Sequence, residues 1–208
     1  MKILPSLASA NQMKLEEEIK RLGDHSYLHF DIEDGNFVPN ISFGMKTVRA
    51  AAKLTDAARD AHLMVTNPLD YIDDLKELDF SAVAFHWEST GYPLRVINQI
   101  KKYGMKAGIG INPATDVKQL KLYLNKIDYV LIMTSEPDGQ GDQFQKEMIE
   151  KVEWLAKQKL ENLEIIADGG IGTEELKLLE EAGVTGAVMG RMVFGADDPL
   201  DTIEKLSR

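Results

Sequence analysis

The sequence contains no cysteine, which excludes disulfide bonds and thiolate ligands to a metal ion. Any transition-metal site must therefore use histidine and carboxylate side chains. No run approaches the roughly 20 apolar residues of a membrane-spanning helix, and no signal-peptide pattern precedes the first strand-like run. We therefore expect a soluble, cytoplasmic protein with no membrane partner.

Positively charged residues are outnumbered by negatively charged ones. The chain has 24 lysine and arginine residues against 34 aspartate and glutamate residues, which gives a formal net charge of −10. Such an acidic protein is a poor partner for nucleic acid or for an anionic membrane surface. No linker, low-complexity segment or break in composition divides the 208 residues. We therefore predict a single domain, residues 1–208, that does not bind nucleic acid.

Eight short apolar runs alternate with amphipathic stretches. The runs cover residues 3–7, 27–30, 61–65, 82–85, 107–111, 129–133, 163–167 and 186–189. Short, nearly continuous apolar runs are typical of parallel strands that are buried on both faces. Eight strands alternating with eight helices fit a closed barrel or a doubly wound open sheet. The count of eight, and the lack of a G-x-G-x-x-G motif at the first helix, favour a single (β/α)8 TIM barrel of the α/β class.

Polar side chains stand at the ends of three predicted strands. His29 and Asp31 are two residues apart and face the same way on the second strand, while His62 lies on the third and Asp168 ends the seventh. In a barrel, the carboxyl ends of all strands meet at one mouth. Each residue taken alone is best read as a polar residue that closes a strand, but the four together predict a metal site with a built-in acid and base. Imidazole and carboxylate ligands suit zinc, and also iron, manganese or cobalt.

Longer motifs occur along the chain in a fixed order. The longest is HFDIEDGNFVPN at residues 29–40, and the others lie at residues 4–10, 43–44, 62–65, 112–115, 133–134 and 168–171. With these motifs the chain resembles the ribulose-phosphate 3-epimerase family over nearly its whole length. The resemblance implies a (β/α)8 barrel, a phosphosugar substrate and inversion of the carbon next to a ketone. It also implies a divalent metal ion held by His29, Asp31, His62 and Asp168.

The resemblance implies further roles within the site. Asp31 and Asp168 would remove a proton from one face of C3 and return one to the other, through an enediolate whose charge a metal stabilises. Ser6 would contact the substrate. Met64 and Met133 would lie beside the reacting carbon, although methionine more often fills a core. Glycine backbone would hold the phosphate in the loops that contain Gly141, Gly169, Gly170 and Gly190.

Three positions depart from the family pattern. Glu33 replaces a methionine, and it either adds a negative charge near the metal that recognises a different group or turns to solvent. The loop at residues 136–144 has two aspartates where the family has a glycine-rich sequence, and carboxylates repel a phosphate. Arg191 follows Gly190 in place of a small polar residue, and it either binds an anion or pairs with a nearby surface aspartate.

Together these features predict an isomerase, a metal-dependent C3 epimerase of a ketose phosphate. The expected substrate is of the ribulose 5-phosphate and xylulose 5-phosphate type, which places the enzyme in pentose phosphate metabolism. One alternative is an epimerase of a different ketose, such as allulose 6-phosphate or an unphosphorylated sugar. Another is a barrel that has lost turnover and acts as a binding protein, although retention of Asp31 and Asp168 weighs against it.

Three further points complete the prediction. A sugar-acid decarboxylase would need a catalytic lysine near the second or third strand, and residues 29–34 and 61–65 contain none. His86 and Glu88, near the end of the fourth strand, could line the mouth, but the resemblance gives them no catalytic role. Self-association into a homo-oligomer is suggested by the resemblance alone.

Overall fold

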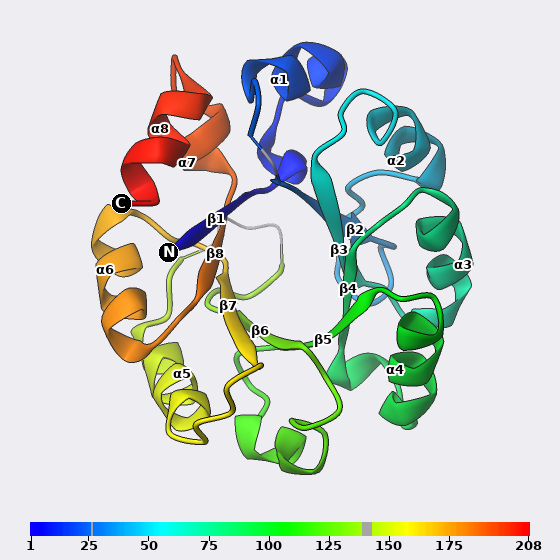
Figure 1. Cartoon of the computed structure of the whole chain (residues 1–208), viewed down its shortest axis with the longest axis vertical. Coiled ribbons are helices and arrows are strands. Elements are labelled where there is room, and N and C mark those ends of the chain that lie inside the picture. Colours follow the sequence, from blue (N-terminus) through cyan, green and yellow to red (C-terminus); the bar gives the residue numbers. More distant parts are fainter. Residues whose placement is uncertain (26, 139–142) are drawn as a thin grey trace.

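Eight parallel strands form one sheet that curls into a barrel (Figure 1). The computed structural model describes residues 1–25, 27–138 and 143–208. The strands are β1 (Lys2–Pro5), β2 (Tyr27–Glu33), β3 (Ala58–Met64), β4 (Ala82–His86), β5 (Lys106–Ile111), β6 (Tyr129–Met133), β7 (Glu164–Asp168) and β8 (Gly186–Met189). They pair in the order β1-β8-β7-β6-β5-β4-β3-β2. The predicted (β/α)8 barrel is therefore confirmed.

The ring closes where β1 meets β2, a junction that we call the seam. Here Ser6 and His29 form a single parallel bridge, whereas the other neighbouring strands share between three and seven register pairs. Ser6 follows the last residue of β1 directly. The seam therefore lies beside one of the predicted metal ligands.

The register of the ladders brings polar residues of different strands to the same level. Asp31 pairs with His62 across β2 and β3, and Met133 pairs with Asp168 across β6 and β7. All strands run in one direction, so these residues gather at the carboxyl end of the barrel.

Helices surround the barrel, as Figure 1 shows. The α-helices are α1 (Leu15–Arg21), α2 (Met45–Ala51), α3 (Leu69–Glu77), α4 (Pro93–Lys102), α5 (Ile149–Ala156), α6 (Thr173–Ala182), α7 (Arg191–Phe194) and α8 (Pro199–Leu206). Short 3-10 helices are η1 (Leu7–Ser9), η2 (Gln12–Lys14), η3 (Trp87–Ser89), η4 (Val117–Leu122) and η5 (Lys146–Met148). None of the helices in the described ranges combines the length and the apolar character that crossing a membrane requires.

The expected alternation of strands and α-helices is wrong at one crossover. Between β5 and β6 the chain forms the 3-10 helix η4, whereas β8 is followed by both α7 and α8. Val117 and Leu120 are the buried residues of η4. Residues three apart eclipse each other in a 3-10 helix, so this spacing suits that geometry.

The interior of the barrel is filled with side chains rather than open. Leu4, Tyr129, Leu131 and Val188 belong to the apolar cluster inside the sheet, and all are buried. Gly108 makes room for this filling, because a Cβ atom at that position would lie 2.3 Å from the Tyr129 ring. The interior of the barrel below the carboxyl ends of the strands is therefore filled, and the open space lies at the mouth.

Candidate functional site

Four side chains at the barrel mouth bring two imidazoles and two carboxylates together. We call His29, Asp31, His62 and Asp168 the His/Asp cluster. One ligand-type atom from each residue lies within 4.8 Å of those of the other three. His62 Nδ1 lies 3.0 Å from Asp31 Oδ1 and 3.2 Å from Asp168 Oδ2, and His29 Nε2 lies 3.1 Å from Asp31 Oδ1.

The donor atoms of the cluster fit a metal ion. Ligands about 2.0 Å from a tetrahedral zinc ion stand about 3.3 Å apart, and the histidine nitrogens lie 3.0 to 3.8 Å from the carboxylate oxygens of Asp31 and Asp168. The two histidines are fully buried, so their nitrogens are shielded from water. Two neutral nitrogens and two carboxylate oxygens are ligands that zinc accepts, and iron, manganese and cobalt accept the same set.

Asp60 orients one of these histidines. Its Oδ2 atom lies 2.8 Å from His29 Nδ1, which leaves His29 Nε2 facing Asp31 and Asp168. Metal-ligating histidines commonly donate their second N–H group to a carboxylate in this way. Our sequence prediction missed Asp60, although it precedes His62 by two residues on β3, the spacing that identified His29 and Asp31.

The cluster also separates the proton affinities of its two aspartates. Burial opposes the charge of Asp31, but His29 and His62 outweigh burial and hold the pKa of Asp31 well below its usual range. Burial, followed by the negative charge of Asp31, raises the pKa of Asp168. Asp31 is therefore the ionised carboxylate of the pair, and Asp168 holds a proton more readily.

The neighbouring carboxylates also shift the pKa values of the two histidines. Burial disfavours their charged forms, but the neighbouring carboxylates outweigh it. The pKa of His29 is raised well above its ordinary value by Asp60 and Asp31. The pKa of His62 is raised to about 9 by Asp168 and Asp31. Without a cation in the cluster these histidines attract protons, and a metal ion would displace them.

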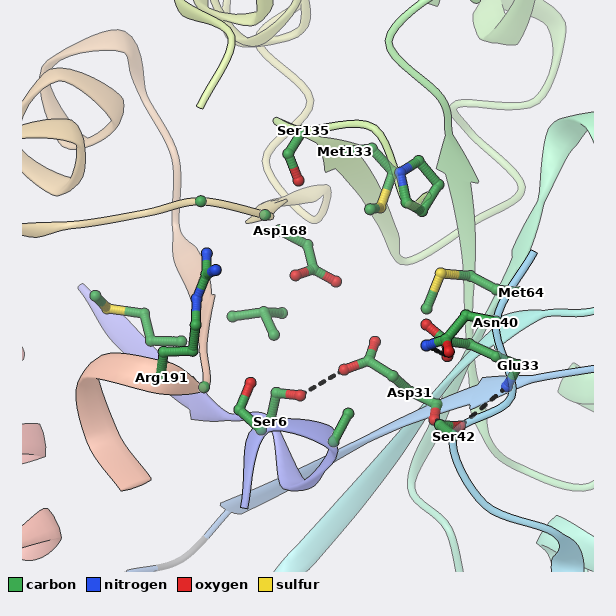
Figure 2. A pocket seen from close by; sticks show the side chains of 18 of the residues that line it. Ser6, Asp31, Glu33, Asn40, Ser42, Met64, Met133, Ser135, Asp168 and Arg191 are labelled. Carbon is green, nitrogen blue, oxygen red and sulfur yellow. Dashed lines mark hydrogen bonds between the residues drawn. The ribbon is translucent and has the colours of Figure 1, made fainter. Parts of the chain in front are cut away.

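A cavity of about 390 Å³ opens above the cluster (Figure 2). This volume lies within the usual range for small-molecule sites. Ten residues that the sequence assigned to the site line it: Ser6, Asp31, Glu33, Met64, Met133, Asp168, Gly169, Gly170, Gly190 and Arg191. Gly141, which we assigned to phosphate binding, lies outside the described residues.

Glu33 and Arg191 lie at opposite ends of the view into the cavity, with Asp31 and Asp168 between them (Figure 2). Glu33 Oε2 accepts a hydrogen bond of 2.7 Å from Asn40 Nδ2. Burial, followed by the charge of Asp31, raises the pKa of Glu33 to about 7. Of the two orientations open for Glu33, the structure has the one toward the cavity.

The backbone of the loops at Gly169 and at Gly190 is tightly packed against neighbouring serines. Gly169 and Gly170 have φ angles of 114° and 68°, which glycine adopts without strain. A Cβ atom on Gly169 would lie 2.2 Å from Ser135 Oγ, and one on Gly190 would lie 2.1 Å from Ser9 Oγ. Both loops therefore require glycine and bring bare backbone to the cavity wall.

Ser135 is a second residue that the sequence prediction missed. Its hydroxyl is buried, lines the cavity and has no hydrogen-bond partner among the described residues. An unpaired buried hydroxyl costs free energy unless a ligand or water satisfies it. Its position two residues after Met133 was the signal that could have identified it.

Known proteins are similar to this chain in sequence and in architecture. The family model described as "Ribulose-phosphate 3 epimerase family" matches residues 2–194. The cytoplasmic isoform of ribulose-phosphate 3-epimerase from Oryza sativa subsp. japonica is 38% identical over 214 residues, which cover 100% of this chain and 93% of the rice protein. The ribulose-phosphate 3-epimerase of Methanocaldococcus jannaschii is 36% identical over 211 residues, which cover 99% of this chain and 89% of that protein.

The solved structures support the fold alone. The crystal structure of KGPDC from Streptococcus mutans superposes with a TM-score of 0.74 over 99% of this chain and 95% of that chain, at 14% identity. Identity over the full length with the curated relatives is much higher, and it confirms the resemblance seen in the motifs. The chain belongs to the ribulose-phosphate 3-epimerase family, and it is an isomerase of the carbohydrate epimerase kind.

Proposed function

We propose that the protein inverts C3 of a ketose phosphate of the ribulose 5-phosphate and xylulose 5-phosphate type, with a divalent metal ion as its cofactor. The observation that carries this proposal is the geometry of Asp31 and Asp168, which line one cavity and belong to a cluster of four potential metal-ligand side chains. An epimerase needs one ionised and one protonated group beside the same carbon. The curated relatives named above, which are ribulose-phosphate 3-epimerases, support this choice of substrate.

In each aspartate, one oxygen atom would bind the metal and the other would transfer a proton. Asp31 Oδ1 and Asp168 Oδ2 approach the histidines, which leaves Asp31 Oδ2 and Asp168 Oδ1 for proton transfer. In one direction ionised Asp31 takes the C3 proton from one face, and protonated Asp168 delivers a proton to the other face. In the reverse direction their roles exchange.

A metal ion would be held by the His/Asp cluster, with zinc the best match and iron, manganese or cobalt also compatible. When bound, it would supply the positive charge that stabilises negative charge developing on the substrate oxygens next to C3. Met64 and Met133 would keep water from the reacting carbon, since both line the cavity and are almost fully buried.

The substrate would lie along the cavity with its phosphate toward Arg191. Gly169, Gly170 and Gly190 offer close backbone on that side, and the Arg191 guanidinium carries a charge that suits a phosphate. The hydroxymethyl end of the ketose would then approach Glu33. If the Glu33 carboxylate accepts a hydrogen bond from a sugar hydroxyl at this end, the substrate would be the alternative, a different ketose such as allulose 6-phosphate or an unphosphorylated sugar.

Exchange of the C3 hydrogen with deuterium oxide tests the proposal. We expect the metal-loaded protein to introduce deuterium into ribulose 5-phosphate and to form xylulose 5-phosphate. Exchange only into allulose 6-phosphate or an unphosphorylated ketose would move the substrate to the alternative. A protein that binds no metal and exchanges none of these sugars would be the inactive binding barrel, and the proposal would be wrong.

The remaining expectations belong with this proposal. Residues 1–208 would act as one catalytic domain. Self-association and a cytoplasmic location stay predictions, to be measured by light scattering and by cell fractionation.

A further inference from the structure

We propose that His86 and Glu88 are positioning residues that orient the metal ligand His62, an inference that rests on the proposed metal-dependent function. His86 Nε2 lies 2.8 Å from His62 Nε2, and His86 Nδ1 lies 3.2 Å from Glu88 Oε2. The three side chains form a hydrogen-bonded row, which we call the β4 relay. It leads away from the His/Asp cluster toward the loop after β4.

The proton positions along the β4 relay follow from the cluster. His62 Nδ1 faces Asp31 and Asp168, so it must give up its proton when it binds a metal ion. The proton of His62 then resides on Nε2 and is donated to His86 Nε2. His86 in turn carries its own proton on Nδ1 and donates it to the Glu88 carboxylate. One arrangement of protons therefore satisfies the whole row.

Glu88 is itself held in place at the far end of the relay. Its Oε1 atom accepts a hydrogen bond of 2.9 Å from the backbone N–H of Asn112 and another from the hydroxyl of Thr115. The hydroxyl of Ser89 donates 2.6 Å to the His86 carbonyl and secures the turn η3 between the strand and Glu88. The carboxylate is therefore a fixed acceptor rather than a mobile surface group.

The barrel leaves space for the two imidazoles, which meet edge to edge in nearly the same plane. The rings of His62 and His86 lie 5.0 Å apart with an interplanar angle of 20°. Gly110 faces them from β5, and a Cβ atom there would lie 3.3 Å from His86 Nε2 and 3.5 Å from His62 Nε2. Phe37 covers the His86 ring at 4.8 Å between centroids. His86 is fully buried, so its nitrogens are shielded from bulk solvent.

Each histidine of the cluster is thus linked by hydrogen bonds to a carboxylate, one directly and the other through a second histidine. His29 donates directly to the Asp60 carboxylate, whereas His62 reaches a carboxylate through His86. Loss of such outer partners typically weakens metal binding by about 10- to 100-fold. We expect the β4 relay to contribute to metal affinity by that amount.

Metal affinity in the absence of substrate tests the relay. We expect His86→Phe, which keeps a ring but removes the acceptor for His62, to weaken zinc binding by about 10- to 100-fold in competition with a chelating dye. His86→Gln keeps an acceptor for His62 and a donor for Glu88, and it should stay within about threefold of the wild type. Equal affinity of His86→Phe and the wild type would overturn the proposal.

Phe37→Leu is the matched packing control, because Phe37 contacts the His86 ring but forms no hydrogen bond with it. We expect this variant to bind zinc like the wild type. If it weakens zinc binding as much as His86→Phe does, packing rather than hydrogen bonding supports His62, and the relay is wrong. If the wild type itself binds no zinc, the proposed metal-dependent function fails first, so the two failures are distinguishable.

The tautomers of the wild-type zinc-loaded protein give a measurement that requires no variant. Nitrogen-15 NMR of the histidine rings should show a protonated Nε2 on His62, and a protonated Nδ1 with an unprotonated Nε2 on His86. A proton on His86 Nε2 would contradict the relay, even if every variant failed to fold.

Discussion

The hydroxyl of Ser6 donates a hydrogen bond of 2.5 Å to Asp31 Oδ2. Ser6 stands at the seam of the barrel, where it also bridges to His29. The junction that closes the sheet thus orients the carboxylate that we propose as a base.

Replacing Ser6 by alanine removes this hydrogen bond and leaves Asp31 Oδ2 without its donor. We expect Ser6→Ala to lower kcat about 10-fold, because a hydrogen bond to a charged group contributes about 1.5–3 kcal/mol, part of which water recovers. Steady-state kinetics separate this role from substrate contact. A raised KM with unchanged kcat would mean that Ser6 binds the sugar and does not orient Asp31.

The proposed acid and base can be tested one at a time. Asp31→Asn and Asp168→Asn should each lower the epimerisation rate at least ~100-fold, because each removes a proton-transfer group and perturbs the metal ligands. Rates should be measured at matched metal occupancy. A fully metal-loaded variant with near-normal turnover would disprove the two-base mechanism.

Arg191 provides a test of phosphate recognition. We expect Arg191→Ala to raise KM for a ketose phosphate about 10-fold or more, with a smaller change in kcat, because a charge-assisted contact to the anion is lost. Arg95→Ala, on the exposed face of α4, is a suitable control. Unchanged KM in Arg191→Ala would indicate that Arg191 is not an anion ligand.

Removal of the metal should abolish turnover. We expect dialysis against a chelator to inactivate the protein, and stoichiometric zinc, manganese, cobalt or iron(II) to restore activity with one ion per chain. Elemental analysis and activity measured on the same samples check this result. Full activity in a sample shown to be metal-free would exclude the proposed cofactor.

The lowered pKa of Glu88 predicts that the stability of the folded protein depends on pH. Burial alone would raise its pKa, but hydrogen bonds from His86, Thr115 and Asn112 outweigh burial and lower the pKa of Glu88 to about 2. A carboxyl group whose pKa is lowered by folding stabilises the protein above its ordinary pKa and loses that contribution as the pH falls through the folded value.

The measurement compares wild type with Glu88→Gln by urea unfolding of the metal-free proteins. We expect the wild type to be more stable at neutral pH, and the difference in unfolding free energy to shrink between about pH 5 and pH 2. One titrating group limits the slope of this change to about 1.4 kcal/mol per pH unit. A difference that does not vary with pH would mean that the hydrogen bonds to Glu88 do not favour its ionised form.

Residue periodicity predicted the barrel but not the full length of its strands. The strand expected to carry His29 and Asp31 continues as β2 to Glu33, whereas β7 ends at Asp168 as expected. A pattern based on hydrophobicity gives no signal at polar residues that end a strand, such as Glu33. The backbone ladder continues through them, because their side chains face the mouth and their main-chain groups still pair.

The sequence by itself determined the fold class, the family and the chemical identity of the cluster, since strand alternation and ligand chemistry are properties of neighbouring residues. Only the tertiary structure decided that Asp60 contacts His29 and His86 contacts His62, and that Glu33 and Arg191 both line the cavity. Contacts between different strands depend on register and on closure of the ring. Packing of the whole barrel sets both, and no local pattern records them.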